Sequence, residues 1–231
     1  AALLMATLKG HTSIIQLLLA RNANVNATLP DGRTSLYHAV SNGQLGVVKL
    51  LVDRGANVNA IFANGMTSVL LATVRGFIDI LRILIEKGAK IDVPLTKYVD
   101  NLSEGRTALL QASSSGNVEL VKLLLDAGAD VHKRNTDTRA YSCLLMCFAN
   151  NPNFEVATLL LDNRAEVNAQ VGLYKDTCLH YACKATSPNS KLIRLLVERG
   201  ARLDLKNDEG ETCLDLAKKN GHVQTLKFLV D

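Results

Sequence analysis

A phrase that occurs six times in the chain constrains its fold more than any other feature. It consists of a Thr or Ser, one further residue, a Leu or Val, and then small residues. Its first residues are Thr34, Thr67, Thr107, Ser142, Thr177 and Thr212, which lie 33, 40, 35, 35 and 35 positions apart. A fixed period of this length indicates an array of stacked structural repeats.

A second phrase closes five of the units. It has three aliphatic residues, an acidic residue, one variable residue, Gly and Ala, with Arg164 in place of Gly in one unit, and its last residues are Ala56, Ala89, Ala129, Ala165 and Ala201. The Thr or Ser of the first phrase suits a helix N-cap, which contributes about 1 kcal/mol. Apolar residues then follow at helical spacing, as in Val47, Val48 and Leu51. Since one such unit cannot bury its apolar face alone, the units must stack.

The chain resembles the ankyrin-repeat family, with Thr-Cys-Leu-His at 177–180 closest to the family phrase. The resemblance covers essentially all 231 residues. It implies an all-α solenoid of about seven helix–turn–helix units with projecting finger loops. We expect a single array over 1–231, with a partial unit at 1–28, further units from about 29, 62, 102, 137, 172 and 207, and a cap-like last unit.

Several departures from the family pattern carry expectations of their own. Arg164 stands where Gly would close the helix, and a left-handed Arg costs about 1–2 kcal/mol, so we expect a distorted or weaker junction. Residues 94–103 form the largest insertion, and shorter ones fall at 150–153 and 186–190. The first unit is apolar where a terminal cap should be polar, which predicts further residues upstream in the natural protein.

Composition narrows the class of protein. A net charge of +4 with interspersed signs does not indicate nucleic-acid binding, and no apolar run reaches the roughly 20 residues of a membrane helix. The odd number of cysteines, five, favours reduced thiols. We therefore expect a cytoplasmic protein, with the nucleus also open, that is monomeric and does not insert into membranes.

Catalytic and metal-binding patterns are weak in this chain. It contains no phosphate loop, no His-Glu-x-x-His and no Gly-x-Ser-x-Gly, so we expect no enzyme activity and no cofactor. Cys143, Cys178 and Cys213 occupy the same position in successive units, which predicts a ladder with steps of about 10 Å. This spacing is too wide for shared zinc coordination, and we expect buried core thiols, with His180 in the structural His position of the family.

The resemblance implies that a partner protein or peptide binds to the concave surface, at finger tips and at the ends of first helices. The residues carried over to these positions, together with Tyr98 in the insertion, are Arg33, Asn42, Met66, Arg75, Tyr98, Arg106, Ser115, Tyr141, Asp176, Lys184 and Glu211. Basic residues precede Asp176 and Glu211 along the array, which suggests a partner of opposite polarity. Arg and Tyr suit binding hot spots.

A modification is also implied by resemblance. Asn168, eight residues after Leu160, looks like a target of the asparaginyl hydroxylase that acts on many ankyrin repeats, and Asn59 and Asn26 are weaker versions. The alternative is that these asparagines only stabilise the turns between units.

The leading hypothesis is a protein–protein interaction scaffold. A first alternative is a regulatory or targeting segment of a larger enzyme, channel or host-directed effector, with the activity outside this chain. A second alternative, a small-molecule site, lacks the paired aromatic residues that such a groove would need.

Overall fold

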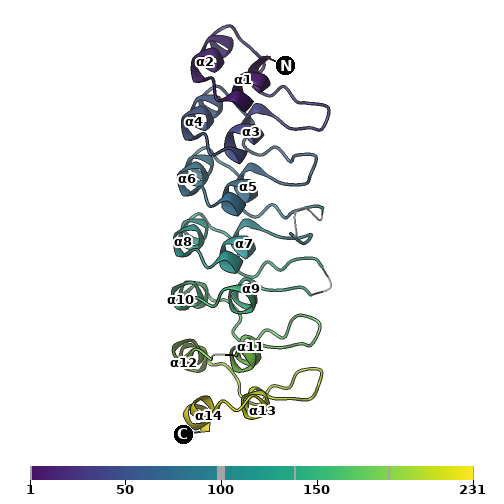
Figure 1. The fold of residues 1–231 in the computed structure, drawn as a ribbon, viewed down its shortest axis with the longest axis vertical. Coiled ribbons are helices and arrows are strands. Elements are labelled where there is room, and N and C mark those ends of the chain that lie inside the picture. The colour runs from purple at the N-terminus through teal and green to yellow at the C-terminus, as the bar shows by residue number, and fades with distance from the viewer. Residues whose placement is uncertain (1, 98–101, 138, 187, 231) are drawn as a thin grey trace. The chain divides into compact units, whose positions relative to one another are not determined.

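The structure is a computed structural model that describes residues 2–97, 102–137, 139–186 and 188–230. These residues form fourteen short α-helices, which follow one another as seven helix–turn–helix pairs. The pairs are joined by finger loops that carry isolated antiparallel bridges, and no sheet is assigned in the described residues. The all-α repeat architecture predicted from the sequence is therefore confirmed (Figure 1).

The chain divides into two compact units, 1–108 and 109–231, and each is described here by itself. In the first unit, each helix pair has one helix beside the finger loops and one helix behind it (Figure 1). The helices of this unit are α1 Ala2–Lys9, α2 Thr12–Ala20, α3 Ser35–Ser41, α4 Leu45–Asp53, α5 Ser68–Arg75 and α6 Ile78–Glu86.

The second unit repeats the same arrangement. Its helices are α7 Ala108–Ser115, α8 Val118–Asp126, α9 Cys143–Asn150, α10 Phe154–Asp162, α11 Cys178–Lys184, α12 Ser190–Glu198, α13 Cys213–Lys219 and α14 Val223–Val230. Among the described helices, none combines the length and the apolar character that a membrane crossing requires.

Thr and Ser side chains begin the first helices as the sequence predicts. The side chains of Thr34 and Thr67 accept hydrogen bonds from the backbone amides three residues later, and Ser142 does the same in the second unit. Thr177 and Thr212 form reciprocal capping boxes with His180 and Asp215. Local capping therefore sets where these helices begin.

The core of each unit lies between its two layers of helices. In the first unit, the largest fully buried side chains include Leu36, Leu51, Leu70 and Leu84. In the second unit, the buried apolar residues include Leu109, Leu124, Leu145, Leu160 and Leu196. Leu51 and Leu84 occupy the same place in successive repeats, as do Leu124, Leu160 and Leu196, so each helix pair buries its apolar face against its neighbour.

The helix closure at Arg164 differs from expectation. Arg164 adopts a left-handed φ of 67°, where Gly128 and Gly200 have 87° and 85°. The next residue, Ala165, still donates its backbone amide to Leu160 O at 2.9 Å, the same distance as for Ala201 and Leu196. The hydrogen bond that closes the helix is therefore not distorted. Arg164 adopts the left-handed φ that is unfavourable for a non-glycine residue.

The 94–103 insertion is anchored at both ends within the first unit. Leu95 and Leu102 are buried, and the Leu95 amide donates to Arg106 O at 2.9 Å. Lys97 Nζ donates to Ala63 O at 2.9 Å, so the start of the insertion lies along the preceding finger. Tyr98 falls outside the described residues.

Candidate functional site

In each unit, the finger loops and the first helices of the pairs form one surface, which we call the finger-side surface (Figure 1). In the first unit this surface consists of the fingers with α1, α3 and α5. In the second unit it consists of the fingers with α7, α9, α11 and α13. The predicted partner-binding residues fall on or beside these elements, and the structure separates them into exposed and buried groups.

Asn42, Arg75 and Ser115 are exposed at the ends of first helices. Asn42 caps the end of α3 and Arg75 is the last residue of α5. Because α1, α3 and α5 pack side by side, Lys9, Asn42 and Arg75 occupy equivalent places on three neighbouring helices of the first unit. They give this surface a polar, partly basic edge.

Arg33 is held in place by its own finger. Its guanidinium forms an ion pair with Asp31, with Nε donating to Oδ2 at 2.7 Å, and it lies 5.9 Å from the centre of the Tyr37 ring. The hydrogen bond from Arg33 lowers the pKa of Asp31 and raises that of Arg33 itself. Tyr37 in turn packs edge-on against Phe62 of the next finger.

Three of the predicted binding residues are buried rather than presented to solvent. Met66 is 3% exposed, Arg106 is 9% exposed and Asp176 is 2% exposed. The insertion lies close to two of them, since Thr96 lies directly against Gly65, the residue before Met66, and the Leu95 amide donates to Arg106 O. We therefore leave these three residues out of the proposed contact surface.

Asp176 has an internal role in the second unit. Its carboxylate accepts hydrogen bonds from Lys184 Nζ at 2.7 Å and from Asn207 Nδ2 at 3.0 Å. Glu211 is likewise paired, with Lys219 at 3.0 Å. The expected acidic end of the surface is thus not formed, since both carboxylates are engaged by lysines of the same unit.

Three tyrosines lie on the finger-side surface of the second unit. The hydroxyls of Tyr141 and Tyr181 lie 3.3 Å apart, and Lys184 Nζ lies 5.5 Å from the centre of the Tyr174 ring. The ring of Tyr141 covers Gly172, where an added Cβ would approach it to 2.8 Å. Burial, together with the hydrogen bond to Tyr141, raises the pKa of Tyr181 above its ordinary value.

Sequence reasoning missed the residues at the tip of this finger. Leu173 and Tyr174 are 63% and 52% exposed, and they lie beside the predicted residues Tyr141 and Lys184. An available signal was the pair of large apolar residues, Leu and Tyr, within a loop that should be polar. We call Tyr141, Leu173, Tyr174, Tyr181 and Lys184 the tyrosine cluster.

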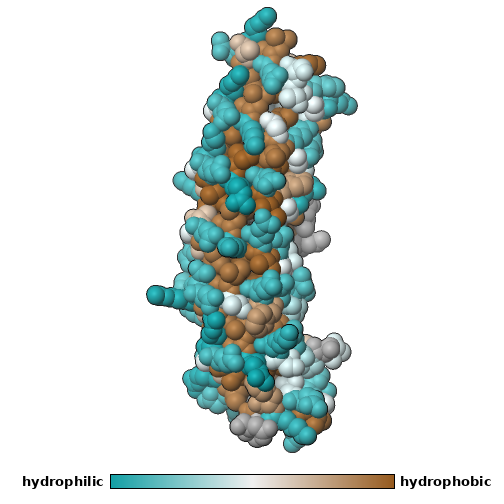
Figure 2. Space-filling view, turned by 90° about the vertical axis from the view of Figure 1, so that its left-hand side faces the viewer, coloured by the Kyte–Doolittle hydropathy of each residue, from teal (hydrophilic) through white to brown (hydrophobic). Residues whose placement is uncertain are grey.

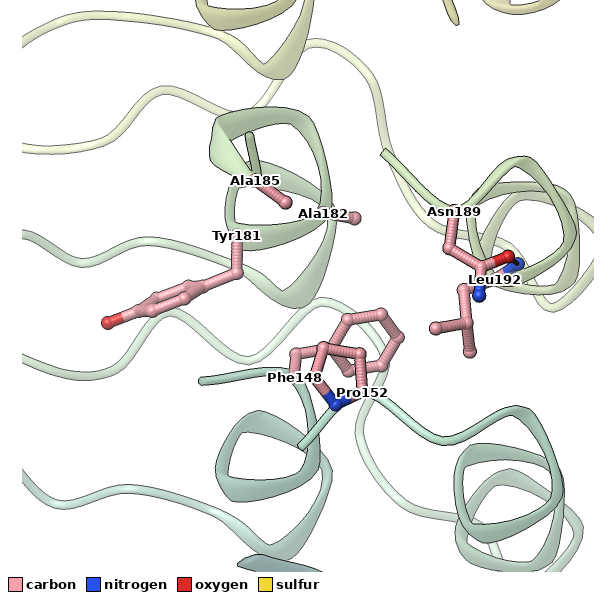
Figure 3. A pocket seen from close by; sticks show the side chains of 7 residues that line it. All are labelled: Phe148, Pro152, Tyr181, Ala182, Ala185, Asn189 and Leu192. Atoms are coloured by element: carbon pink, nitrogen blue, oxygen red, sulfur yellow. Dashed lines mark hydrogen bonds between the residues drawn. The ribbon is translucent and has the colours of Figure 1, made fainter. Parts of the chain in front are cut away.

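A small cavity lies behind the tyrosine cluster, between the turns that follow α9 and α11 (Figure 3). It has a volume of about 50 Å³ and is lined by Phe148, Pro152, Tyr181, Ala182, Ala185, Asn189 and Leu192. Figure 3 shows the Phe148 ring beside Leu192, whereas the Tyr181 hydroxyl is directed away from the cavity. Pockets for drug-sized ligands have volumes of about 300–1,000 Å³, so this one has room only for the end of an apolar side chain.

All five cysteines are unpaired by disulfides and buried, as predicted for core thiols. Burial raises the pKa of Cys147 and Cys178. A hydrogen bond between thiols of neighbouring repeats raises the pKa of Cys183 and lowers that of Cys213, a contact that the sequence did not predict. Within the described residues, no group of three or more His, Cys, Asp or Glu side chains could hold a metal ion.

The asparagines predicted as hydroxylation targets join successive repeats. Asn168 Nδ2 donates to Gly200 O at 2.9 Å, and its Oδ1 accepts from the Arg202 amide at 2.8 Å. In the first unit Asn26 and Asn59 make the same two contacts with the repeat that follows each of them. The turn-stabilising interpretation therefore has a structural basis, and hydroxylation of these side chains stays a prediction.

Comparison with known proteins identifies what this architecture is similar to. A family model described as ankyrin repeats (3 copies) matches residues 3–95, 61–135 and 144–231. The ankyrin repeat domain of human ASB11 is 26% identical with a TM-score of 0.77, over 99% of this chain and 97% of that domain. The ankyrin repeat domain of Bcl-3, a member of the IkappaB family, is 27% identical with a TM-score of 0.79, over 100% of this chain and 98% of that domain. A search of curated proteins by sequence gave no match.

Proposed function

Because this chain belongs to the ankyrin-repeat family, whose domains are generally protein-binding scaffolds, we propose that it binds a partner protein or peptide through its finger-side surfaces. The proposal includes no catalytic role, no cofactor and no nucleic acid. It takes the chain to act as a monomer until its partner binds.

The tyrosine cluster of the second unit is the observation that carries this proposal. Tyr and Arg are enriched at binding hot spots because they combine a large contact area with a polar group. Tyr174 is exposed, while Tyr141 and Tyr181 are held by contacts within the unit. A surface that is already ordered loses little conformational entropy when a partner binds.

The chemistry of this cluster defines the kind of partner segment. Lys184 is paired with Asp176, and Lys175 with Asp208 at 3.1 Å, so the charges next to the cluster are largely neutralised within the unit. What remains for contact is the exposed apolar area of Leu173 and Tyr174 together with tyrosine hydroxyls. We propose that an uncharged segment with an apolar side chain binds here.

The finger-side surface of the first unit suits a different segment. Lys9, Asn42 and Arg75 are exposed in equivalent places on α1, α3 and α5, and Arg33 is part-exposed on a finger. Charged residues at the rim of an interface mainly raise the association rate and favour partners of opposite charge. We propose that an acidic segment of the partner contacts this edge.

Affinity capture with mass spectrometry tests the proposal. The wild-type chain is compared with Tyr174→Ser and with Phe154→Ser, a matched control on α10 whose side chain is 43% exposed. A partner that is lost with Tyr174→Ser and kept with Phe154→Ser supports binding at the tyrosine cluster. Equal capture by all three proteins contradicts it.

A further inference from the structure

The finger of the second unit that carries Leu173 and Tyr174 is held from both sides by its neighbours. The Gly172 amide donates to Arg139 O of the preceding finger at 2.6 Å. On the other side, the Asp208 amide of the following finger donates to Tyr174 O at 2.9 Å. A strand added to this finger would need these backbone groups, so strand pairing is not how a partner binds here. The exposed side chains of the finger make the contacts instead.

Two of the fingers around the tyrosine cluster also contain a left-handed residue that is not glycine. Ala140 has a φ of 46° and Lys175 a φ of 50°. Gly105 and Gly210 hold the same place in the fingers before and after them in the sequence. At one of these places the side chain that glycine lacks is used, because Lys175 Nζ pairs with Asp208 Oδ1 at 3.1 Å. Unfavourable backbone conformations are concentrated at functional sites, which distinguishes these two fingers from the glycine-containing ones.

The tyrosine hydroxyls of the cluster provide hydrogen-bond donors. Those of Tyr141 and Tyr181 lie 3.3 Å apart, so one donates to the other. A bond between two hydroxyls uses only one of their two protons, and the second proton is left for an acceptor of the partner. Tyr174 is 52% exposed and adds a third hydroxyl, together with a ring for apolar contact. The cluster therefore offers donors next to aromatic surface.

The charges beside the cluster are balanced within the second unit. Lys184 Nζ pairs with Asp176 at 2.7 Å and lies 5.5 Å from the centre of the Tyr174 ring. Arg139 pairs with Asp137 at 3.6 Å. These cations already have carboxylate partners, so a charged segment would find no unpaired opposite charge among them. The matching ligand is an uncharged segment that brings acceptors and apolar surface.

We propose that the tyrosine cluster binds a proline-rich segment of the partner in the extended polyproline II conformation. This inference rests on the proposed function and specifies the partner segment for the same site. Such a segment has no amide donors at its prolines and no internal hydrogen bonds, so its carbonyls accept from the tyrosine hydroxyls. Its pyrrolidine rings are uncharged, and they pack on the Tyr174 ring and on Leu173. Proline-rich segments dock on aromatic surfaces in this way because the conformation is already formed before binding.

A fluorescent decaproline peptide is the probe, because oligoproline adopts the polyproline II helix. Two uncharged peptides serve as comparisons. A Gly-Ser peptide of the same length is flexible, and an Ala-Gln-Leu peptide of about 15 residues forms an amphipathic helix. The dissociation constant of each peptide is measured by fluorescence anisotropy.

The wild-type chain is compared with three variants. Tyr174→Ser removes the exposed ring, and the double variant Tyr141→Phe/Tyr181→Phe keeps both rings but removes both hydroxyls. Phe154→Ser is the matched control for unspecific apolar binding. Figure 2 looks onto the side of the molecule formed by the second helices, where apolar surface is also exposed. Phe154 is the first residue of the second helix α10 and is 43% exposed.

We expect decaproline to bind the wild-type chain and Phe154→Ser equally, and to bind Tyr174→Ser at least about tenfold more weakly, as loss of a hot-spot side chain predicts. The double variant should bind it about three- to tenfold more weakly, because the hydrogen bond to the carbonyl is lost. The Gly-Ser and Ala-Gln-Leu peptides should bind the wild-type chain at least about tenfold more weakly than decaproline. All variants should keep the circular dichroism spectrum of the wild type.

Two results would overturn the proposal. If decaproline did not bind, or bound the wild type and Tyr174→Ser equally, a proline-rich segment would not be the ligand of the cluster. If the Ala-Gln-Leu peptide bound as tightly as decaproline, the site would be assigned to a helix. The proposed function has a separate test, because it fails only when capture of the partner does not depend on Tyr174. Failure of decaproline together with a partner that requires Tyr174 would therefore refute this inference alone.

Discussion

Lys184, a member of the tyrosine cluster, forms an ion pair with the buried Asp176, and the contribution of this pair to stability can be measured. The Asp176 side chain is 3% exposed and that of Lys184 is 33% exposed. Their atoms Oδ2 and Nζ lie 2.7 Å apart. Asn207 Nδ2 supplies the second hydrogen bond to the carboxylate, at 3.0 Å. Removal of Lys184 would leave a buried carboxylate with one neutral donor.

The magnitude follows from this burial. Breaking a fully buried ion pair by removing one partner costs about 3–5 kcal/mol. Because water reaches part of Lys184, we expect a smaller loss of about 2 kcal/mol for Lys184→Met. In a double-mutant cycle with Asp176→Asn, the coupling energy should be about 1–2 kcal/mol.

Urea unfolding followed by circular dichroism measures these free energies, since the chain has no Trp for fluorescence. The matched control is the cycle of Arg202→Met with Asp204→Asn in the same unit. That pair has nearly the same distance, 2.6 Å, but its side chains are 59% and 69% exposed. If the two cycles gave the same coupling, burial would not be the reason for the strength of the Asp176 pair, and our reasoning would be refuted.

Three further predictions concern stability, pH and thiol reactivity. Arg164→Gly should stabilise the second unit by up to about 1 kcal/mol in urea unfolding. The reason is that the free-energy cost of a left-handed Arg exceeds the added conformational-entropy cost of folding a Gly, and a loss of stability would contradict this. Hydrogen bonds from the Thr212 amide and hydroxyl lower the pKa of Asp215 in the folded chain. Its contribution to stability is therefore present above the ordinary Asp pKa of 3.8 and is lost as the pH falls through the lower folded-state pKa. Asp215→Asn should make the melting temperature depend less on pH across this range. The raised pKa of the buried Cys147 and Cys178 thiols predicts alkylation by iodoacetamide only after unfolding, and mass spectrometry of the native chain should find them unmodified.

The helix pairs could be predicted from sequence because their signals are local. Thr34 and Thr67 cap helices with bonds to residues three positions away, and the apolar spacing of Val47, Val48 and Leu51 belongs to one helix. Each of these features depends on neighbours within a few residues. The repeat period then supplies the packing between units.

The accessibility of the finger residues could not be predicted in the same way. Whether Met66 or Asp176 faces solvent depends on an adjacent finger or helix, which lies some 30 residues away in the sequence. Carrying the binding positions of the family over to this sequence one residue at a time therefore included buried side chains in the predicted binding surface. It also overlooked Leu173 and Tyr174, because the family pattern assigns no role to a finger tip with two large apolar residues.

Site-specific photo-crosslinking tests most directly whether the tyrosine cluster contacts a partner. A benzophenone amino acid replaces Tyr174 in one protein and Phe154 in another, and both are irradiated in the lysate that supplies the captured partner. Our account predicts a covalent adduct with that partner from position 174 and none from position 154. An adduct from position 154 alone would place the partner on the second-helix side of the unit and contradict the proposed function.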